Sequence, residues 1–294
     1  MKTIVRLFAF AAILASVQSF ALAQGARIGY TATDLDNPGG GGNRVYRIDL
    51  DNPGQTVPVG LTNVPQELEG FFSIDGPTNS SLFGVAENPD TTSTQDPSVL
   101  VNITAAACSA NGLGQLIDVT GIDFGTEAGS AWDHTTNTVY SIASDDLNLA
   151  DGTNLYQIDP STGMAILRSN TPGVYLDGLA VGGDGTLYAT AGRANNPLAL
   201  YRYNFDDEQF EVVGSFGVAL AEDTGLANYR GVSGTETNLY MITEGDGANV
   251  GRLWTVNATT GALTLVGEIR QPGGAEVPED LEGFDIPWRP LACN

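Results

Sequence analysis

The chain has 294 residues, with 35 acidic against 12 basic side chains and a formal net charge of −23 at pH 7. Such a charge argues against binding nucleic acid or anionic lipid by simple attraction, and it favours cations or basic partners. With two cysteines and one histidine, the chain cannot build a multi-histidine metal cage, a cysteine zinc site or a disulfide-based fold.

The first 23 residues have the pattern of a secretory signal peptide. A positively charged start precedes an apolar run over 7–17, and Ala21-Leu22-Ala23 fits a small-x-small cleavage site. The run is shorter than the about 20 apolar residues that a membrane-spanning helix needs. We therefore expect residues 1–23 to be removed, and residues 24–294 to form a single domain that is secreted or periplasmic and has no membrane span.

One sequence unit recurs five times along the rest of the chain. Its members begin 45 to 55 residues apart with an apolar pair and alternating residues: Val45-Tyr46-Arg47-Ile48-Asp49, Leu100-Val101-Asn102-Ile103-Thr104, Leu155-Tyr156-Gln157-Ile158-Asp159, Leu200-Tyr201-Arg202-Tyr203-Asn204 and Leu253-Trp254-Thr255-Val256-Asn257. Each opening strand is followed by a tight turn, a second strand, a loop, a third strand, a turn and a fourth strand. β-Branched and aromatic alternation between Gly/Pro/Asn/Asp turns is typical of strands, and no segment after the signal has the pattern of an amphipathic helix.

Four antiparallel strands repeated at this spacing predict an all-β fold, a five-bladed β-propeller. The last unit stops after its third strand, at 281–286, and the missing fourth strand is found at the other end of the chain, in 27–33. Pairing of this N-terminal strand with the C-terminal blade would close the ring and leave no open sheet edge.

The repeats at 155–163 and 253–261 resemble those of exported bacterial β-propellers whose units read L-Y-x-I-D-x-x-T-G. The resemblance extends over nearly all of residues 24–294 and is weakest at 99–140. It implies the propeller architecture and no particular activity, because propellers carry many different functions.

The loops divide the predicted disc into two unlike faces. On one face the turns are short, whereas on the other the loops are long and several are acidic, as at 34–43, 86–98 and 144–154. We call these the short-loop face and the long-loop face. Functional residues concentrate on loops held by a rigid scaffold, so we predict function on the long-loop face. Cys108 and Cys293 both fall on the short-loop face, where export allows a disulfide between them.

The innermost strands all enter from the long-loop face, so residues in equivalent register should form a ring around the axis. We set this register by one glycine in each blade: Gly70, Gly129, Gly178, Gly231 and Gly283. The residue just before the glycine is charged in four blades, and in the remaining blade Glu127 lies one position earlier than this register. Together they predict a ligand-binding ring of Glu69, Glu127, Asp177, Arg230 and Glu282.

Carboxylates that converge in this way resist ionising together, so that either one pKa rises or a cation binds between them. Arg230 would relieve the repulsion or grip an anionic group. The alternative is a structural ion network that braces the ring without any ligand, since such networks also perturb pKa values.

Two weaker signals lie outside this ring. Asp145, Asp146, Asn148 and Asp151 form an oxygen-rich segment that is a candidate for weak Ca²⁺ binding. His134 is expected in a surface turn on the short-loop face. No serine has a histidine partner on the long-loop face, which argues against a Ser-His-Asp hydrolase.

The sequence leaves open whether the protein is an enzyme, and it identifies no catalytic residue. The first hypothesis is a binding module for a protein, glycan or small molecule, favoured because no catalytic constellation is recognisable. The second, by analogy with five-bladed glycosidases, is a glycoside hydrolase in which two of Glu69, Asp177 and Glu282 act as acid and base or nucleophile. The third is a Ca²⁺-dependent lactonase or phosphoesterase. We expect a monomer, with Ca²⁺ as the candidate cofactor.

Overall fold

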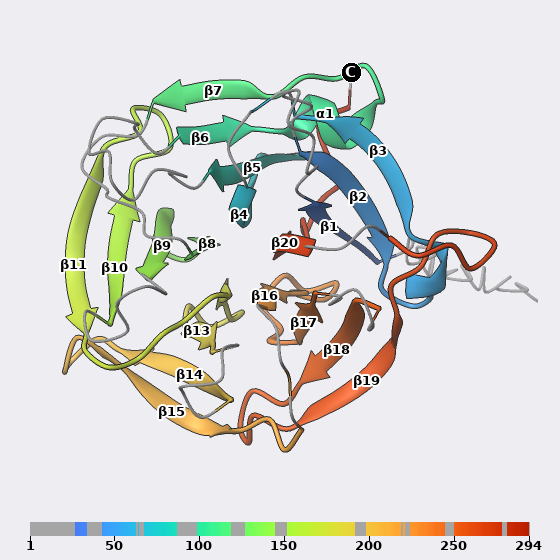
Figure 1. The fold of residues 1–294 in the computed structure, drawn as a ribbon. Coiled ribbons are helices and arrows are strands. Elements are labelled where there is room, and N and C mark those ends of the chain that lie inside the picture. The colour runs from blue at the N-terminus through green and yellow to red at the C-terminus, as the bar shows by residue number, and fades with distance from the viewer. Residues whose placement is uncertain are drawn as a thin grey trace, which may run out of the picture.

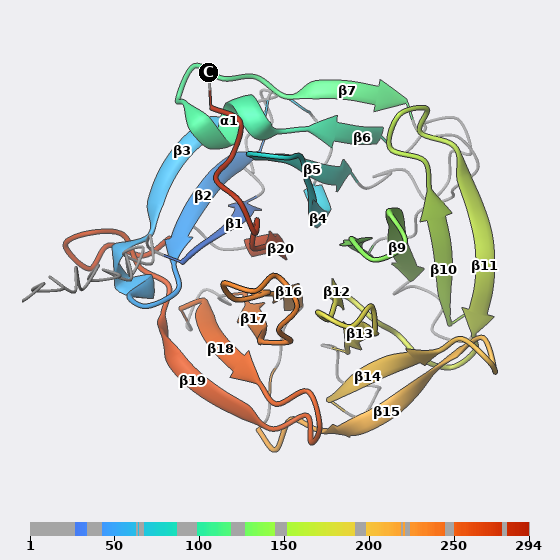
Figure 2. The ribbon, with the colours of Figure 1, turned by 180° about the vertical axis from the view of Figure 1, so that it is seen from behind.

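The computed structural model contains five four-stranded antiparallel sheets arranged in a ring (Figures 1 and 2). This five-bladed β-propeller confirms the predicted fold class. The predicted signal peptide lies outside the described residues. The structure describes residues 27–33, 43–62, 64, 68–86, 99–118, 127–144, 152–191, 198–218, 220, 224–244, 250–277 and 281–293.

Each blade orders its strands from the axis to the rim. Blade 1 contains β4 (Leu68–Asp75), β5 (Ser80–Ala86), β6 (Val99–Asn102) and β7 (Gln115–Asp118). Blade 2 contains β8 (Glu127–Asp133), β9 (Thr138–Ser144), β10 (Thr153–Ile158) and β11 (Ala165–Thr171). Blade 3 contains β12 (Leu179–Val181), β13 (Leu187–Thr190), β14 (Ala199–Asn204) and β15 (Gln209–Ser215). Blade 4 contains β16 (Thr224–Asn228), β17 (Leu239–Thr243), β18 (Arg252–Val256) and β19 (Leu263–Glu268). Blade 5 contains β20 (Leu281–Asp285), β1 (Ile28–Thr33), β2 (Arg44–Asp49) and β3 (Val57–Leu61).

The third strand of each blade contains the apolar pair that recurs in the sequence. In β10, Leu155 packs into the hydrophobic cluster between blades 2 and 3, whereas the adjacent Tyr156 packs into the cluster between blades 1 and 2. Successive side chains of a strand point to opposite faces of the sheet. Two neighbouring apolar residues are therefore needed because both faces of a blade are covered by other blades.

The ring closes as the repeat predicts. The last strand, β20, pairs antiparallel with the first, β1, with Tyr30 opposite Asp285 and Thr33 opposite Leu281. Blade 5 is thus built from both ends of the described chain, and its innermost strand has one hydrogen-bonded neighbour, as in the other blades.

The outermost strands carry irregularities that suit their exposed position. In β3, β11, β15 and β19, the register shifts opposite the repeated apolar pair of the third strand. A bulge bends the strand and increases its twist, and edge strands with bulges are poor templates for pairing with another chain. We infer that these bulges protect the rim from edge-to-edge association.

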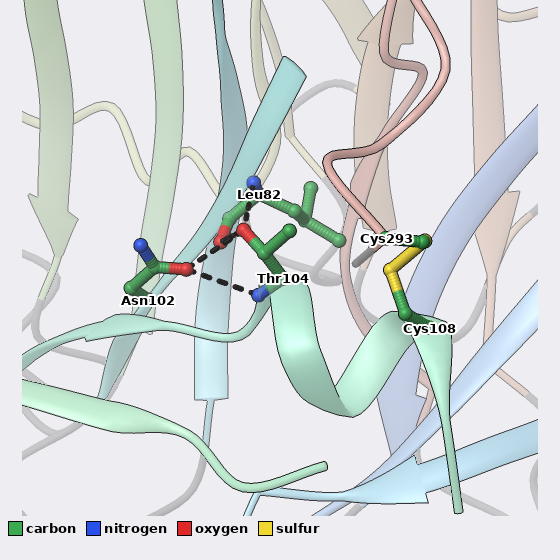
Figure 3. Close-up of a disulfide and its surroundings, with 5 residues drawn as sticks. All are labelled: Leu82, Asn102, Thr104, Cys108 and Cys293. Carbon is green, nitrogen blue, oxygen red and sulfur yellow. Dashed lines mark hydrogen bonds between the residues drawn. A yellow bond between two sulfur atoms is a disulfide. The ribbon is translucent and has the colours of Figure 1, made fainter. Parts of the chain in front are cut away.

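A short helix departs from the expectation of strands alone. The one-turn helix α1 (Thr104–Cys108) lies in the connection between β6 and β7, and the 3₁₀ turn η1 (Pro53–Gln55) lies between β2 and β3. Thr104 anchors α1, since its hydroxyl accepts a hydrogen bond from the backbone N–H of Leu82 at 2.9 Å (Figure 3). Five residues are too few to show a helical period in the sequence.

The predicted disulfide is present. It joins Cys108, at the end of α1, to Cys293, which is 185 residues further along the chain, with the two Cα atoms 5.5 Å apart (Figure 3). The bond fastens the C-terminal residues to blade 1. Among the described residues there is no helix that is both long and apolar enough to cross a membrane.

Removing the disulfide is expected to lower stability strongly. A cross-link that closes so long a loop restricts the unfolded chain and contributes about 3–5 kcal/mol. The Cys108→Ala/Cys293→Ala variant should therefore melt roughly 10 °C below the parent protein in a thermal scan. As a control, a reductant should lower the Tm of the parent protein and leave that of the double variant unchanged. Equal melting temperatures for parent and variant would contradict the expectation.

Candidate functional site

The innermost strands touch one another at a ring of glycines, which defines the level of the candidate site on the axis. Its members are Gly70, Gly129, Gly178, Gly225 and Gly283. At each member, the position that a Cβ atom would occupy lies within about 3 Å of the next inner strand, and in Gly129 it lies 2.3 Å from the backbone oxygen of Asp177. The inner strands can approach this closely only where no side chain intervenes.

The ring corrects the sequence-based register in blade 4. The glycine that packs against its neighbour there is Gly225, beside Phe284, and not Gly231. Gly231 lies beyond the end of β16 in a turn, with a φ of 63°. The residue that precedes the ring glycine in this blade is therefore Thr224, whose hydroxyl lies 2.6 Å from that of Thr190 in blade 3.

Two of the predicted acidic residues, Glu69 of blade 1 and Asp177 of blade 3, lie at this ring. Glu69 and Asp177 are 7% and 5% exposed, and both line a cavity of about 10 Å³ on the axis. Backbone contacts hold Asp177 in place: its N–H donates to the carbonyl of Thr190 at 2.9 Å, and the N–H of Gly178 donates to the Thr190 hydroxyl at 3.1 Å.

The two other predicted acids, Glu282 and Glu127, also lie on inner strands. Glu282 precedes Gly283 in β20, opposite Ala32 of β1, and Glu127 is the first residue of β8. Both side chains lie outside the described part of the structure, as do most residues of the long loops. The backbone register thus places a third carboxylate residue, Glu282, at the same level as Glu69 and Asp177.

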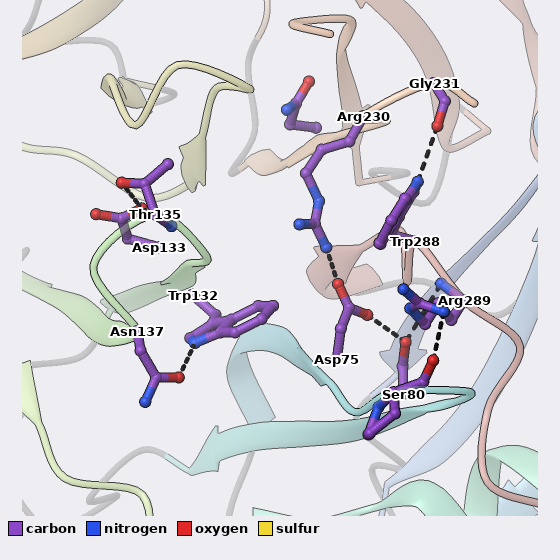
Figure 4. A network of polar contacts seen from close by, with 12 residues as sticks. Asp75, Ser80, Trp132, Asp133, Thr135, Asn137, Arg230, Gly231, Trp288 and Arg289 are labelled. Atoms are coloured by element: carbon purple, nitrogen blue, oxygen red, sulfur yellow. Dashed lines mark hydrogen bonds and ion pairs between the residues drawn. The ribbon is translucent and has the colours of Figure 1, made fainter. Parts of the chain in front are cut away.

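Arg230 does not belong to this ring. It follows β16 at the short-loop end of the axis, where its guanidinium forms an ion pair with Asp75, the last residue of β4 (Figure 4). Both side chains are buried, and Asp75 also accepts a hydrogen bond from the hydroxyl of Ser80. The predicted role of Arg230 in relieving repulsion among the axial acids therefore does not hold.

Two tryptophans flank the Arg230 guanidinium. Its central carbon lies 5.5 Å from the ring centroid of Trp132 and 5.2 Å from that of Trp288, within the range of cation–π attraction (Figure 4). Trp288 is fixed in turn, because its indole N–H donates to the carbonyl of Gly231 at 2.9 Å. We call Arg230, Trp132 and Trp288 the axial plug.

A second cavity, of about 30 Å³, lies next to the axial plug. Its polar lining comes from Ser73, Asn228, Arg230 and Asp285. Burial raises the pKa of Asp285 to about 7, against a weaker opposing effect of a hydrogen bond with Ser73. Its Oδ2 atom is buried and has no hydrogen-bond partner among the described residues. A carboxyl in this setting is largely neutral below pH 7.

His134 lies in the expected turn, between β8 and β9, but it is half buried. Burial lowers its pKa, and the nearby positive charge of Arg230 lowers it further. Its Nδ1 atom is buried without a hydrogen-bond partner in the described structure. The imidazole therefore belongs to the polar cluster around the axial plug and is more than a surface turn residue.

The weaker calcium candidates cannot be placed. Asp145, Asp146, Asn148 and Asp151 lie outside the described residues. Within the described ranges, no group of three or more His, Cys, Asp or Glu side chains is arranged to hold a metal ion. A calcium site formed by these four residues stays a prediction.

Sequence reasoning missed the polar groups at the short-loop end of the axis. Asp75 and Asp133 each lie six residues after an acid of the predicted ring, Glu69 and Glu127 respectively, and Asp285 lies three residues after Glu282. Because the inner strands run in parallel, polar residues near their far ends are expected to converge at the short-loop end of the axis, as those near the first glycines do at the long-loop end.

The likeness of this chain to known proteins is a likeness in fold and not in sequence. No protein-family model matches the chain, and no curated protein matches it in sequence. The Bacteroides ovatus xyloglucan PUL GH43B protein superposes with a TM-score of 0.52 at 12% identity, over 86% of this chain and 56% of that one. Weaker likenesses are a luciferin-regenerating enzyme (TM-score 0.47, 11% identity, 88% and 75% covered) and an exo-β-1,3-galactanase from Phanerochaete chrysosporium (0.46, 10%, 70% and 51%). The chain thus spans about half the length of the first and third of these proteins.

Proposed function

We propose that this protein is an exported binding module, secreted or periplasmic and monomeric, that takes its ligand at the acidic long-loop end of the axis. The proposal is supported by the position of acidic residues from separate blades at one level of the axis. Glu69 and Asp177 are buried beside one cavity, and Glu282 occupies the same register on a third inner strand. These strands run in parallel around the axis, so their acids share one end of it.

The size of the cavity restricts what the ligand can place there. A cavity of about 10 Å³ is too small for a sugar ring or an aromatic group. The ligand would remain above the glycine ring and direct a compact cationic group, an ammonium, a guanidinium or a Ca²⁺ ion, toward the carboxylates. The formal charge of −23 would attract such ligands over longer distances.

A glycoside hydrolase is the second candidate. It is favoured by the same pair of buried carboxylates, because glycoside cleavage uses two acids that face a common space. In that case two of Glu69, Asp177 and Glu282 would act as acid and base or nucleophile. The likeness to the Bacteroides ovatus GH43B protein concerns the fold and leaves the choice between the two candidates open.

The Glu69→Gln/Asp177→Asn variant is expected to lose about tenfold or more in affinity for a cationic probe. The substitutions remove two negative charges of the protein that would attract the probe, and they keep the shapes of the side chains. Calorimetric titration with CaCl₂ after chelation, and with a short oligoarginine peptide, measures this loss. A chromogenic aryl-glycoside panel tests turnover in parallel. Turnover by the parent protein that the variant lacks would establish the second candidate in place of the first.

The matched control is the Asp206→Asn/Glu208→Gln variant. It removes two exposed carboxylates from the turn between β14 and β15, on the short-loop face. It should bind both probes as the parent protein does. An equal loss in both variants would indicate general attraction to an acidic surface and contradict the proposal, as would the failure of the parent protein to bind either probe.

A further inference from the structure

The C-terminal residues 286–293, which we call the strap, cross the short-loop face from the axis to blade 1 (Figure 2). The strap supplies Trp288 to the axial plug. Its Arg289 guanidinium donates to the carbonyl of Pro77 at 2.6 Å, and the N–H of Ala292 donates to the carbonyl of Ser80 at 2.9 Å. Asp285 is the residue at which β20 ends and the strap begins.

Ionisation of Asp285 would add a negative charge beside the Arg230–Asp75 ion pair. Arg230, the basic group that acts on it, is already paired with Asp75, and Asp75 itself opposes ionisation of Asp285. The side chains of Leu179, Val181 and Ile286 also line the cavity, and none of them can compensate a negative charge. An ionised Asp285 would leave one uncompensated negative charge in this place, which is costly when water is excluded.

We propose that Asp285 is a protonation switch for the strap: the neutral acid allows the axial plug to close over the cavity, and ionisation loosens the plug and the strap together. The ionised carboxylate needs water, and water reaches its buried Oδ2 atom when Trp288 and the strap move away. The disulfide at Cys293 keeps the far end attached, so the movement is local and reversible. This inference concerns the short-loop face and does not rest on the proposed function.

The direction of the pH effect follows from the raised pKa. Asp285 has a pKa of about 7 when the strap is closed, and an exposed aspartate has a pKa near 3.9. The closed state therefore binds the proton more tightly, so closure is most stable below about pH 4 and weakens as the pH rises to about 7. Above that pH both states are ionised and the effect levels off.

Other titratable groups that face the cluster are distinguishable from Asp285. They are Asp75 on β4, Asp133 and His134 at the end of β8, Glu236 in the turn after β16, and Arg230 and Arg289. Burial opposes ionisation of Asp133, but hydrogen bonds from Thr136 and Thr135 lower its pKa. The pKa of His134 is also lowered, so its protonation would loosen the cluster as the pH falls, which is the opposite direction.

Hydrogen exchange of the Trp288 indole N–H, which donates to the carbonyl of Gly231 at 2.9 Å, tests the proposal. In the parent protein, its protection, corrected for the intrinsic exchange rate, should fall by up to about tenfold for each pH unit between pH 5 and 7 and then level off. In Asp285→Asn and Asp285→Ser, it should be independent of pH over the same range. His134→Gln should retain the behaviour of the parent protein.

Two results would overturn the switch. One is a protection factor in the parent protein that is constant or rises between pH 5 and 7. The other is a fall with pH that persists in both Asp285 variants or disappears in His134→Gln. The use of two Asp285 substitutions covers the case in which one of them disturbs the fold, and exchange of core amides in β10 reports that disturbance separately.

Discussion

Replacing Gly129 with alanine should lower the free energy of unfolding by about 3 kcal/mol or more, with a Tm lower by roughly 6–9 °C. The added Cβ atom would lie 2.3 Å from the backbone oxygen of Asp177 and 2.8 Å from the backbone nitrogen of Leu179. Both are main-chain atoms of the adjacent inner strand, so the clash cannot be relieved by a side-chain rotation. Chemical denaturation and thermal melting both measure the effect.

Gly54→Ala is the matched control for this prediction. Gly54 lies in η1, and the closest atom that its Cβ would meet is the Oδ1 of Asn52 at 3.7 Å. Alanine there should change stability little or increase it by up to about 1 kcal/mol, because it restricts the unfolded chain without strain. Similar losses at both positions would mean that contact between inner strands at the glycine ring is not what limits the packing of the blades.

Arg230→Met should destabilise the protein by about 3–5 kcal/mol, because it leaves the Asp75 carboxylate buried without its charged partner. The substitution also removes the guanidinium from between Trp132 and Trp288. Two of the three tryptophans in the chain belong to the axial plug, so the loss should be accompanied by a change in intrinsic fluorescence. Denaturant unfolding measures the loss in free energy.

A second substitution distinguishes the contribution of the ion pair to stability from that of side-chain packing. Asp75→Leu combined with Arg230→Met should be less destabilised than Arg230→Met alone, because the double variant has no unpaired buried charge. Arg270→Met, which removes the ion pair to the exposed Glu268, should cost less than about 1 kcal/mol. A double variant that is as unstable as the sum of the single variants would contradict a direct interaction between Asp75 and Arg230.

The blade architecture, the ring closure and the disulfide were all predictable from sequence, because each leaves a periodic or paired signal. The apolar pair of the third strand recurs five times since every blade is covered on both faces. The incomplete last unit and the isolated strand at 27–33 are complementary, and they pair as β20 and β1. The order of the strands predicts Cys108 and Cys293 on one face, and they are bonded.

The register of blade 4 was not predictable in the same way. Gly225 and Gly231 both follow a polar residue, Thr224 and Arg230, and the sequence contains no measure of how closely a backbone is approached. What distinguishes them is three-dimensional: Gly225 packs against Phe284 of the adjacent inner strand, whereas Gly231 has a positive φ in a turn. A register set by Gly231 predicts Arg230 at the long-loop end of the axis, whereas it lies at the short-loop end with its partner Asp75.

The pairing of β1 with β20 also sets the order of events when the protein is made. Among the described strands β1 is translated first, yet its neighbour on the side of the axis, β20, is translated last. Until that strand emerges, β1 can pair with β2 alone, and Cys108 has no thiol to meet. A nascent chain that stops before residue 281 therefore lacks the strand that closes the ring.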